Sequence, residues 1–281
     1  MRVYLQGGLG NQLFQLAAGL AVTERLQVNL VLDCSRLGNP ETALRKFALG
    51  PYKLPARVHV DLKPSRYSIF MNKRQVNRLR NIWRNRHLVE TEGKFDTKFL
   101  RVRPGSTLDG YFQSSLYFQN VKDEILGILE SCDLGDEKQV VKRLNSEPFS
   151  AVHIRRGDYT DPLIAKVHGL AGPGYFKRAV ELIAKDKGNT RFLYFSDSPE
   201  LVQHELDLTP EDFVPNSLSE VATLWLMSRG NNVVASNSSF SWWAGFICTN
   251  RVNGKVVVPE PWFRDSTPDD LVPTSWIRLA K

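Results

Sequence analysis

Cysteines and long hydrophobic runs are scarce in this chain, and each shortage excludes a class of protein. Only three cysteines occur in 281 residues, at the widely separated positions 34, 132 and 248. That number and spacing favour neither a disulfide framework nor a zinc site. No stretch approaches the roughly 20 apolar residues that span a bilayer, and the N-terminus lacks the apolar region of a signal peptide. The sequence therefore predicts a protein of the reducing cytoplasm.

The remaining composition is that of an ordinary globular protein, with 42% hydrophobic and 24% charged residues. Predicted strands and helices alternate along the chain, which favours an α/β fold with parallel sheets. We expect an N-terminal Rossmann-like half over 1–146, with an irregular basic insert at about 40–105. A second Rossmann-like half follows over 147–281, and its C-terminal tail is expected to pack back on the body.

The net charge of +7 is concentrated in one part of the chain. Between Lys63 and Arg103 there are 12 Lys or Arg residues and three acidic residues. A helix is expected from Asn72 to His87, with an apolar stripe flanked by arginines. This helix is either a solvated basic face over ordinary core residues or a surface for an anionic partner. No nucleic-acid motif accompanies it, so nucleic acid is not expected as the partner.

The segment HIRRGDYT at 153–160 contains many side chains that could bind a ligand or take part in catalysis. It follows a short apolar stretch, 149–152, that is typical of a buried parallel strand. Two adjacent arginines at a strand's carboxyl end are costly to bury unless an anion meets them, and guanidinium groups match phosphate oxygens. The alternative is a structural Arg–Asp ion pair. Side chains alternate along a strand, so His153 and Arg155 should share one side, with Arg156 on the other.

A glycine turn at 7–10 separates the first predicted strand from the first predicted helix. Gly8 and Gly10, with Asp33 about 20 residues further on, partly match the dinucleotide-binding fingerprint GxGxxG. An NAD(P)- or FAD-dependent oxidoreductase is therefore one alternative function. Leu13 stands where the third glycine of that fingerprint would be, and a hydride-transferring enzyme has no need of paired arginines in the second half.

Two polar segments end strands of the second half. The turn NSSF at 237–240 begins a helix, in which Ser238 or Ser239 is a natural N-cap. Free amide groups at a helix start also form an anion site, and the two roles can coexist. Asp197 follows an apolar strand and is either a helix N-cap or a partner for a ribose or base.

Four stretches lie in one order along most of the chain: GGLGNQLFQ at 7–15, HIRRGDY at 153–159, FSD at 195–197 and SNSSFSWWAG at 236–245. Together they resemble the bacterial α-1,2-fucosyltransferases of glycosyltransferase family 11. One departure is Ser198, which stands where many members of that family carry a second Asp. The resemblance therefore leaves the role of position 198 open.

The resemblance implies a GT-B-like fold, with two Rossmann-like halves facing a cleft. It implies an inverting glycosyltransferase that moves L-fucose from GDP-β-L-fucose to O2 of a β-galactoside, in the synthesis of O-antigen or another surface glycan. The second half would bind GDP-fucose, and the first half would face the acceptor, either free or linked to lipid pyrophosphate. A non-catalytic carbohydrate-binding protein of polysaccharide assembly is the other alternative.

By the same resemblance, Arg155 contacts the donor's phosphates and His153 lies near the guanine. The candidate catalytic residues are Arg155, for charge on the leaving group, and Asp158, as general base, with Glu260 and Asp265 in reserve. The candidate donor-binding residues are Gly8, Gly10, Asn11, His153, Arg155, Arg156, Asp197, Asn237, Ser238, Ser239 and Phe240.

Sugar-nucleotide transferases that use a divalent metal hold it on paired carboxylates, and we find no DxD triplet at a predicted strand end. Asp269 and Asp270 are adjacent, but they follow Pro268 in what reads as a polar tail. We therefore expect no metal and no cofactor, with Arg155 and a helix terminus stabilising the leaving group. If the basic run is a surface for an anionic partner rather than a solvated face, it predicts contact with a pyrophosphate-linked acceptor or peripheral contact with anionic lipid at the inner face of the plasma membrane.

Overall fold

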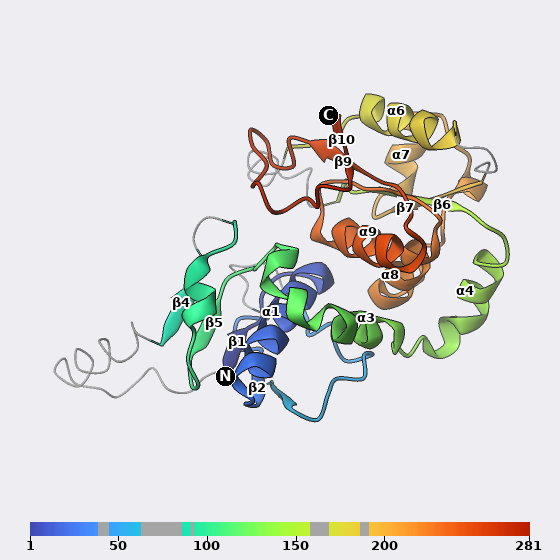
Figure 1. Ribbon diagram of the computed structural model, residues 1–281. Coiled ribbons are helices and arrows are strands. Elements are labelled where there is room, and N and C mark those ends of the chain that lie inside the picture. Colours follow the sequence, from blue (N-terminus) through green and yellow to red (C-terminus); the bar gives the residue numbers. More distant parts are fainter. Residues whose placement is uncertain (39–44, 63–85, 91–92, 158–168, 186–190) are drawn as a thin grey trace. The chain divides into compact units, whose positions relative to one another are not determined.

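The computed structural model divides the chain into two compact units. The first unit comprises Met1–Cys132 with Asp269–Leu271, and the second comprises Asp133–Pro268 with Val272–Lys281. The structure describes residues 1–38, 45–62, 86–90, 93–157, 169–185 and 191–281. Each unit contains one five-stranded sheet whose strand pairs are all parallel, so the expected α/β class is confirmed (Figure 1).

The sheet of the first unit has the strand order β3-β2-β1-β5-β4. Its strands are β1 (Arg2–Tyr4), β2 (Leu30–Asp33), β3 (Val58–Asp61), β4 (His87–Val89) and β5 (Thr107–Asp109). Val3, Leu32 and Leu108 are fully buried on the face covered by helix α1 (Leu9–Leu26). A Cβ atom on Gly19 of α1 would lie 2.8 Å from Leu30, so glycine permits close packing of the helix on the sheet.

Short helices and aromatic side chains complete the first unit. The helices are η2 (Thr97–Arg101), η3 (Ser115–Tyr117), η4 (Gln119–Val121) and α3 (Lys122–Glu130). Tyr117 packs edge-on against Phe99 and Phe112, with ring centroids 4.9 and 5.2 Å apart. Such edge-to-face pairs stabilise the unit beyond the burial of their apolar area.

The sheet of the second unit has the order β10-β9-β8-β6-β7 and carries helices on both faces (Figure 1). Its strands are β6 (Ser150–Ile154), β7 (Phe192–Ser196), β8 (Val233–Val234), β9 (Val256–Glu260) and β10 (Ile277–Ala280). Its helices are η5 (Gly135–Glu137), α4 (Lys138–Leu144), α6 (Pro173–Ala184), α7 (Pro199–Leu206), η7 (Pro210–Asp212), α8 (Glu220–Arg229) and α9 (Ser239–Val252). Helices α6 and α7 share a buried core with Val152 and Ile154 of β6. Helix α8 contacts β6, and α9 contacts β8 and β9.

The division between the units lies at Cys132 and Asp133, earlier than the expected boundary at 146. Helix α4 packs against α8 of the second unit. The Ser219 hydroxyl donates to Glu137 over 2.6 Å, and the Ser219 amide donates to the same carboxylate. These contacts place 133–146 with the second unit rather than with the first.

The insert expected to be irregular contributes two strands, β3 and β4, to the first sheet. Both are short, and their alternating polar residues hide the apolar run that marks a buried strand. The expected helix from Asn72 lies largely outside the described residues, but its last residue, His87, begins strand β4. Most of the basic run, residues 63–85 and 91–92, also lies outside them.

The C-terminal region is more structured than a tail. Strand β10 pairs in parallel with β9, and Trp276 is buried 5.5 Å from the ring centroid of Trp242. The C-terminal tail is therefore held against the second unit by the pairing of β10 with β9 and by the contact of Trp276 with Trp242.

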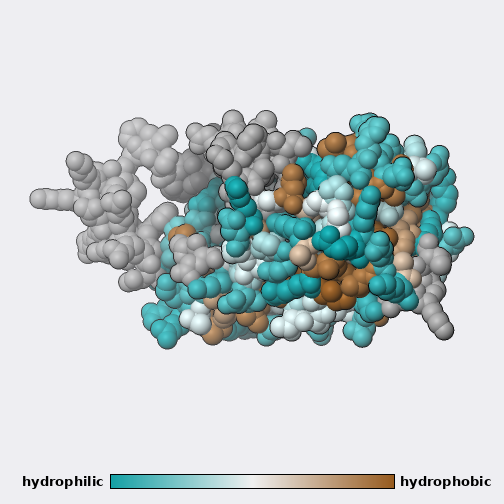
Figure 2. All heavy atoms as spheres, turned by 90° about the horizontal axis from the view of Figure 1, so that it is seen from above, coloured by the Kyte–Doolittle hydropathy of each residue, from teal (hydrophilic) through white to brown (hydrophobic). Residues whose placement is uncertain are grey.

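Hydrophilic side chains predominate on the face shown in Figure 2, and apolar ones appear there in separate patches. Within the part of the chain that the structure describes, no helix combines the length and apolarity that crossing a bilayer requires.

Two glycines offer a direct test of the packing. Gly127 lies in α3, where an added Cβ would meet nothing within 4 Å, so Gly127→Ala should stabilise the protein by about 0.5–1 kcal/mol. A Cβ on Gly254 would lie 2.2 Å from the Asn231 carbonyl oxygen, so Gly254→Ala should destabilise it by about 1–3 kcal/mol. Urea unfolding of both variants measures the two changes, and equal stability of the pair would contradict the packing of Gly254.

Candidate active site in the second unit

Strands β6 and β7 and helices α8 and α9 surround a cavity of about 170 Å³ at the carboxyl edge of the second sheet. The residues that line it are His153, Arg155, Phe195, Ser196, Asp197, Val214, Pro215, Asn216, Leu218, Glu220, Thr223 and Phe240. Ligands of open α/β sheets bind at this edge. The cavity therefore lies where the sequence placed the anion site.

His153 is buried at the floor of this cavity. Its Nδ1 lies 2.5 Å from the Ser241 hydroxyl and 3.1 Å from the Ser236 hydroxyl, and its ring centroid lies 5.5 Å from that of Phe240. Burial, with the nearby charge of Arg155, lowers the pKa of His153 from 6.5 to about 3. The imidazole is therefore neutral at physiological pH, and the two serines fix its orientation.

Arg155 and Asp197 form an ion pair at the cavity wall. The Arg155 Nε lies 3.1 Å from the Asp197 carboxylate, and each side chain is about one quarter exposed. The other Asp197 oxygen accepts from the backbone amides of Arg156 and Gly157, over 2.8 and 3.0 Å. A Cβ on Gly157 would lie 2.6 Å from this carboxylate, so a larger residue there would displace Asp197 from its present position. Asp197 thus holds the loop after β6 and orients the guanidinium of Arg155.

Arg156 points away from the cavity, as the alternation along the strand predicts. Its side chain is only 4% exposed and bonds to Glu205 through Nε and Nη2, over 2.9 and 2.7 Å. The guanidinium carbon also lies 5.6 Å from the ring centroid of Phe176. The side chain of Arg156, a candidate donor-binding residue, is therefore engaged in an ion pair with Glu205. The contact of Arg156 with the site is through its backbone amide, which donates to Asp197.

The turn at 237–240 begins helix α9. Ser238 is the N-cap, and its hydroxyl accepts from the Phe240 amide over 3.3 Å. The Asn237 side chain is buried and donates to the Gly169 carbonyl over 2.9 Å. Ser239 is the first residue of the helix, and Phe240 reaches the cavity. The cap predicted from the sequence is present beside His153 and Arg155.

The N-cap role considered for Asp197 is wrong, because Ser198 is the N-cap of α7. Asp197 is instead engaged by the amides after β6, and it stays a candidate partner for a ribose or base. The structure also answers what Ser198 does: it precedes Pro199 at the helix start, and its amide donates to the Ser196 hydroxyl over 3.0 Å.

Three residues of the site were missed from the sequence. Ser236 and Ser241 hold His153, and Glu205 neutralises Arg156. Ser236 and Ser241 lie inside the SNSSFSWW motif, so their position was a usable signal. Glu205 is part of a helix pattern with no local signal, because its partner lies far away in the sequence.

The glycine turn lies in the first unit, at the N-terminus of α1. Gly8 is the N-cap of this helix, and a Cβ there would meet nothing within 4 Å. Gly7 is the constrained residue, since its φ is +77° and a Cβ would lie 2.4 Å from Asn11. Gly10 is buried within the helix, and Asn11 accepts from Gln113 over 2.7 Å. Three candidate donor-binding residues, Gly8, Gly10 and Asn11, thus lie in the first unit, whereas the cavity lies in the second.

The features that suggested a dinucleotide site have other uses. Asp33 is buried, is paired with Arg2, and accepts from the Ser35 amide over 2.9 Å. The hydrogen bond with Ser35 and the ion pair with Arg2, opposing the effect of burial, lower its pKa. Its carboxylate is therefore committed within the protein rather than presented to a ribose.

The remaining acidic candidates differ in their surroundings. Asp158 lies outside the described residues. Glu260 accepts from the Thr267 hydroxyl over 2.9 Å, whereas the Asp265 side chain is largely exposed. The expectation of a polar tail at Asp270 is wrong, because this carboxylate accepts from the Phe95 amide over 2.6 Å in the first unit. Among the described residues, no three His, Cys, Asp or Glu side chains cluster to hold a metal.

The buried histidine makes the stability of the protein depend on pH. Because the pKa of His153 falls from 6.5 to about 3 on folding, the unfolded chain binds the proton more readily. Above pH 6.5, His153 therefore causes no loss in the free energy of unfolding. Below pH 6.5, that free energy falls by about 1.4 kcal/mol per pH unit, until the pKa of the folded state is reached. Urea unfolding between pH 7 and 5 should show a flatter acid decline for His153→Gln than for the wild type. His59→Gln, at an exposed position, is the control, and equal slopes in all three would contradict this assignment.

Comparison with known proteins gives a consistent result. The family model for glycosyl transferase family 11 matches residues 1–266. The O-antigen biosynthesis glycosyltransferase WbnK of Escherichia coli is 29% identical over 98% of this chain and 99% of its own. An α-1,2-colitosyltransferase of E. coli is 29% identical over 99% and 98%. Galactoside α-(1,2)-fucosyltransferase 1 of Lagothrix lagotricha is 24% identical over 51% and 43%.

The fold is also that of solved fucosyltransferases. The structure of NodZ α-1,6-fucosyltransferase soaked with GDP-fucose superposes with a TM-score of 0.54 at 17% identity, covering 95% of this chain and 96% of NodZ. The fold is therefore GT-B-like, as expected. The match to the family model over nearly the whole chain rules out the oxidoreductase alternative, and the chain belongs to glycosyltransferase family 11.

Proposed function

We propose that this enzyme transfers L-fucose from GDP-β-L-fucose to O2 of a β-galactoside, forming an α-1,2 linkage with inversion. Sugar transfer itself follows from membership of family 11. The observation that carries the finer proposal is the position of Arg155 in a cavity at the carboxyl edge of the second sheet, where a nucleotide's phosphates would bind. The name of a primate relative, a galactoside α-(1,2)-fucosyltransferase, supports the acceptor and linkage.

In the proposed reaction, the galactose O2 attacks the fucosyl anomeric carbon as GDP departs. Negative charge then grows on the β-phosphate oxygen that was bonded to the sugar. Donors aimed at that oxygen stabilise the transition state more than the ground state. Arg155, oriented by Asp197, and the amides at the start of α9 would supply them. Asp158 remains the proposed general base for the O2 proton.

The neutral His153 and the ring of Phe240 would bind the nucleoside part of the donor. A neutral imidazole fixed by two serine hydroxyls offers its other nitrogen to a polar atom of the base. We further propose that the acceptor is a precursor of O-antigen or another surface glycan, either free or lipid-linked, which the names of the bacterial relatives support. The basic run at 63–103 would then approach anionic lipid headgroups.

Colitosyl transfer is a second candidate, favoured by the E. coli relative that spans the whole chain. Colitose is fucose without its 3-hydroxyl group, so both donors present the same pyrophosphate to Arg155. The two candidates differ only in whether the 3-hydroxyl group of the donor sugar favours transfer. Competition between GDP-fucose and GDP-colitose for the enzyme distinguishes them.

A donor panel tests the proposed function. Purified enzyme is incubated with methyl β-galactoside and GDP-fucose, GDP-colitose, GDP-mannose or a UDP-sugar, and the product linkage is determined by NMR. We expect an α-1,2-fucosyl product that forms equally well in excess EDTA, because Arg155 and the helix terminus stabilise the leaving group. A UDP-sugar or GDP-mannose as best donor would refute the donor assignment. Activity lost in EDTA and restored by Mg²⁺ or Mn²⁺ would refute metal independence.

Lysine substitutions separate the two arginines. Arg155→Lys keeps the charge but loses the forked geometry, so kcat should fall by about 10²–10³. In Arg156→Lys the buried pair with Glu205 is weakened, so thermal stability should fall while kcat at 20–25 °C changes much less. Steady-state kinetics with GDP-fucose, beside thermal unfolding, gives both quantities. A crippled kcat in Arg156→Lys with a near-normal Arg155→Lys would reverse the assigned roles.

A further inference from the structure

The turn that follows β5 in the first unit is strained at a bulky residue. Phe112 has a φ of 53°, in the left-handed region that favours glycine. Such a conformation costs about 1–3 kcal/mol and persists only where the surroundings impose it. A turn needed only to connect two segments would carry glycine at this position, so the strain indicates that the shape of the turn is itself used.

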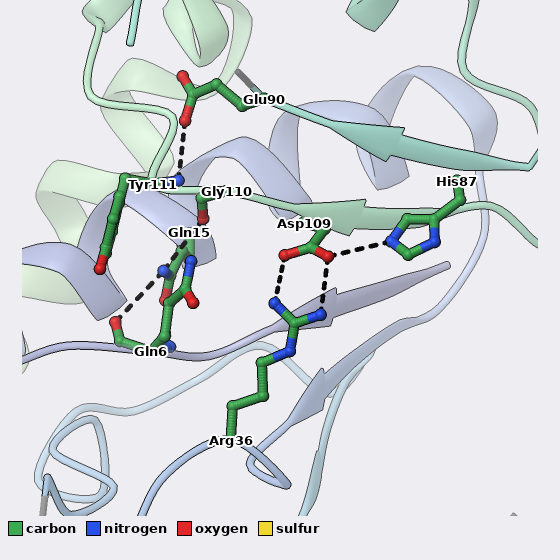
Figure 3. Close-up of polar contacts among 8 residues, drawn as sticks. All are labelled: Gln6, Gln15, Arg36, His87, Glu90, Asp109, Gly110 and Tyr111. Carbon is green, nitrogen blue, oxygen red and sulfur yellow. Dashed lines mark hydrogen bonds and ion pairs between the residues drawn. The ribbon is translucent and has the colours of Figure 1, made fainter. Parts of the chain in front are cut away.

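A partly buried glutamate and a buried glutamine impose this shape (Figure 3). One carboxylate oxygen of Glu90 accepts from the amides of both Tyr111 and Phe112, over 2.8 and 2.6 Å. The fully buried Gln15 donates to the Gly110 carbonyl over 3.1 Å and exchanges hydrogen bonds with the backbone of Gln6. A Cβ on Gly110 would lie 2.5 Å from Glu90. The turn is therefore rigid on its inner side.

The result of this rigidity is an aromatic ring presented to solvent. Tyr111 is 43% exposed, and it is the one exposed aromatic side chain among the described residues. Its own backbone is fixed by Glu90. An exposed tyrosine on a strained turn adds little packing energy to the fold, whereas a ring on a backbone held by hydrogen bonds lowers the entropy cost of binding a ligand.

A polar cluster lies two residues away, at the last residue of β5. Asp109 accepts from both terminal nitrogens of Arg36, with the Nη2 bond at 2.7 Å, and from His87 Nε2 at 3.2 Å. The guanidinium carbon of Arg36 lies 4.2 Å from the ring centroid of Tyr4. Figure 3 shows the side chains of Asp109 and Tyr111 on the same side of the strand. The register of β1, β4 and β5 also places Tyr4, His87 and Asp109 on one sheet face.

This cluster has hydrogen-bonding capacity beyond its internal contacts. The side chains of Arg36 and His87 are 38% and 25% exposed. With the Nε2 proton directed to Asp109, His87 keeps Nδ1 as an acceptor, and Arg36 has further N–H donors. A hydroxyl group both donates and accepts, so neighbouring hydroxyls of a sugar satisfy such a pair, while an anion would use the arginine alone.

We propose that Tyr111 and the Arg36–Asp109–His87 cluster form the acceptor-sugar subsite of this enzyme. The tyrosine ring would cover the apolar C–H face of a β-galactoside, and Arg36 and His87 would bind hydroxyls at its edge. The inference rests on the proposed function and deepens it, since it names the residues that select the acceptor. It concerns the first unit alone.

Kinetics with separate donor and acceptor readouts test the subsite in the full-length enzyme. Tyr111→Ala and His87→Ala should each lower kcat/KM for the β-galactoside by about tenfold or more. The KM for GDP-fucose and the calorimetric Kd of GDP should stay within twofold of the wild type. Tyr111→Phe keeps the ring and should stay close to the wild type. Leu201→Ala in α7 is the matched control, because Leu201 is also 43% exposed.

Direct binding keeps this test separate from the donor assignment. Saturation-transfer NMR with methyl β-galactoside and no donor should show contact in the wild type and its loss in Tyr111→Ala. A galactoside that binds Tyr111→Ala as well as the wild type, or that binds neither, overturns the subsite. Failure of transfer from every GDP-sugar, with galactoside binding intact and sensitive to Tyr111, would reject the proposed function but leave the subsite standing.

Discussion

The carboxylate of Asp197 is the constraint on which the candidate site depends. It accepts two consecutive amides after β6 and pairs with Arg155 through its second oxygen. These contacts join the carboxyl ends of β6 and β7, which are neighbours in the sheet. They also bring the backbone of Gly157 so close to the carboxylate that an added Cβ would displace it. The order of Arg, Arg and Gly in the motif is thus explained by the contacts of the Asp197 carboxylate and by the alternation of side chains along a strand.

The two sheets use their faces differently. In the second unit both faces are covered by helices, and apolar residues of β6 lie against α6 and α7. In the first unit, α1 covers the apolar face of the described strands, while the other face carries Arg2, Asp33, His87 and Asp109, linked in ion pairs. Parallel sheets are normally apolar on both sides. A polar face at strand ends is stable only where its charges are paired. Such a face leaves hydrogen-bonding groups accessible to a polar ligand.

How far the sequence could predict this molecule depended on the range of each interaction. Strand alternation correctly separated Arg155 from Arg156, and the Ser238 cap was readable because both depend on residues close in sequence. The partner of Arg156 was not readable, since Glu205 is distant in the chain and lies in an ordinary helix. Strands β3 and β4 were missed because three- or four-residue strands with polar alternation produce no apolar run. The division at Cys132 depends on packing of α4 against α8, which composition does not reveal.

The strained turn after β5 illustrates a different limit. Strand β5 ends at Asp109, and the chain turns directly after it. The structure buries Phe112 and exposes Tyr111, because Glu90 captures both amides and turns the chain between them. The glycine that permits this is Gly110, pressed against Glu90, rather than the residue with the left-handed backbone. Because the neighbouring side chains hold the turn in a strained conformation, the ring of Tyr111 lies outside the core, which is the basis of the ligand role proposed for it.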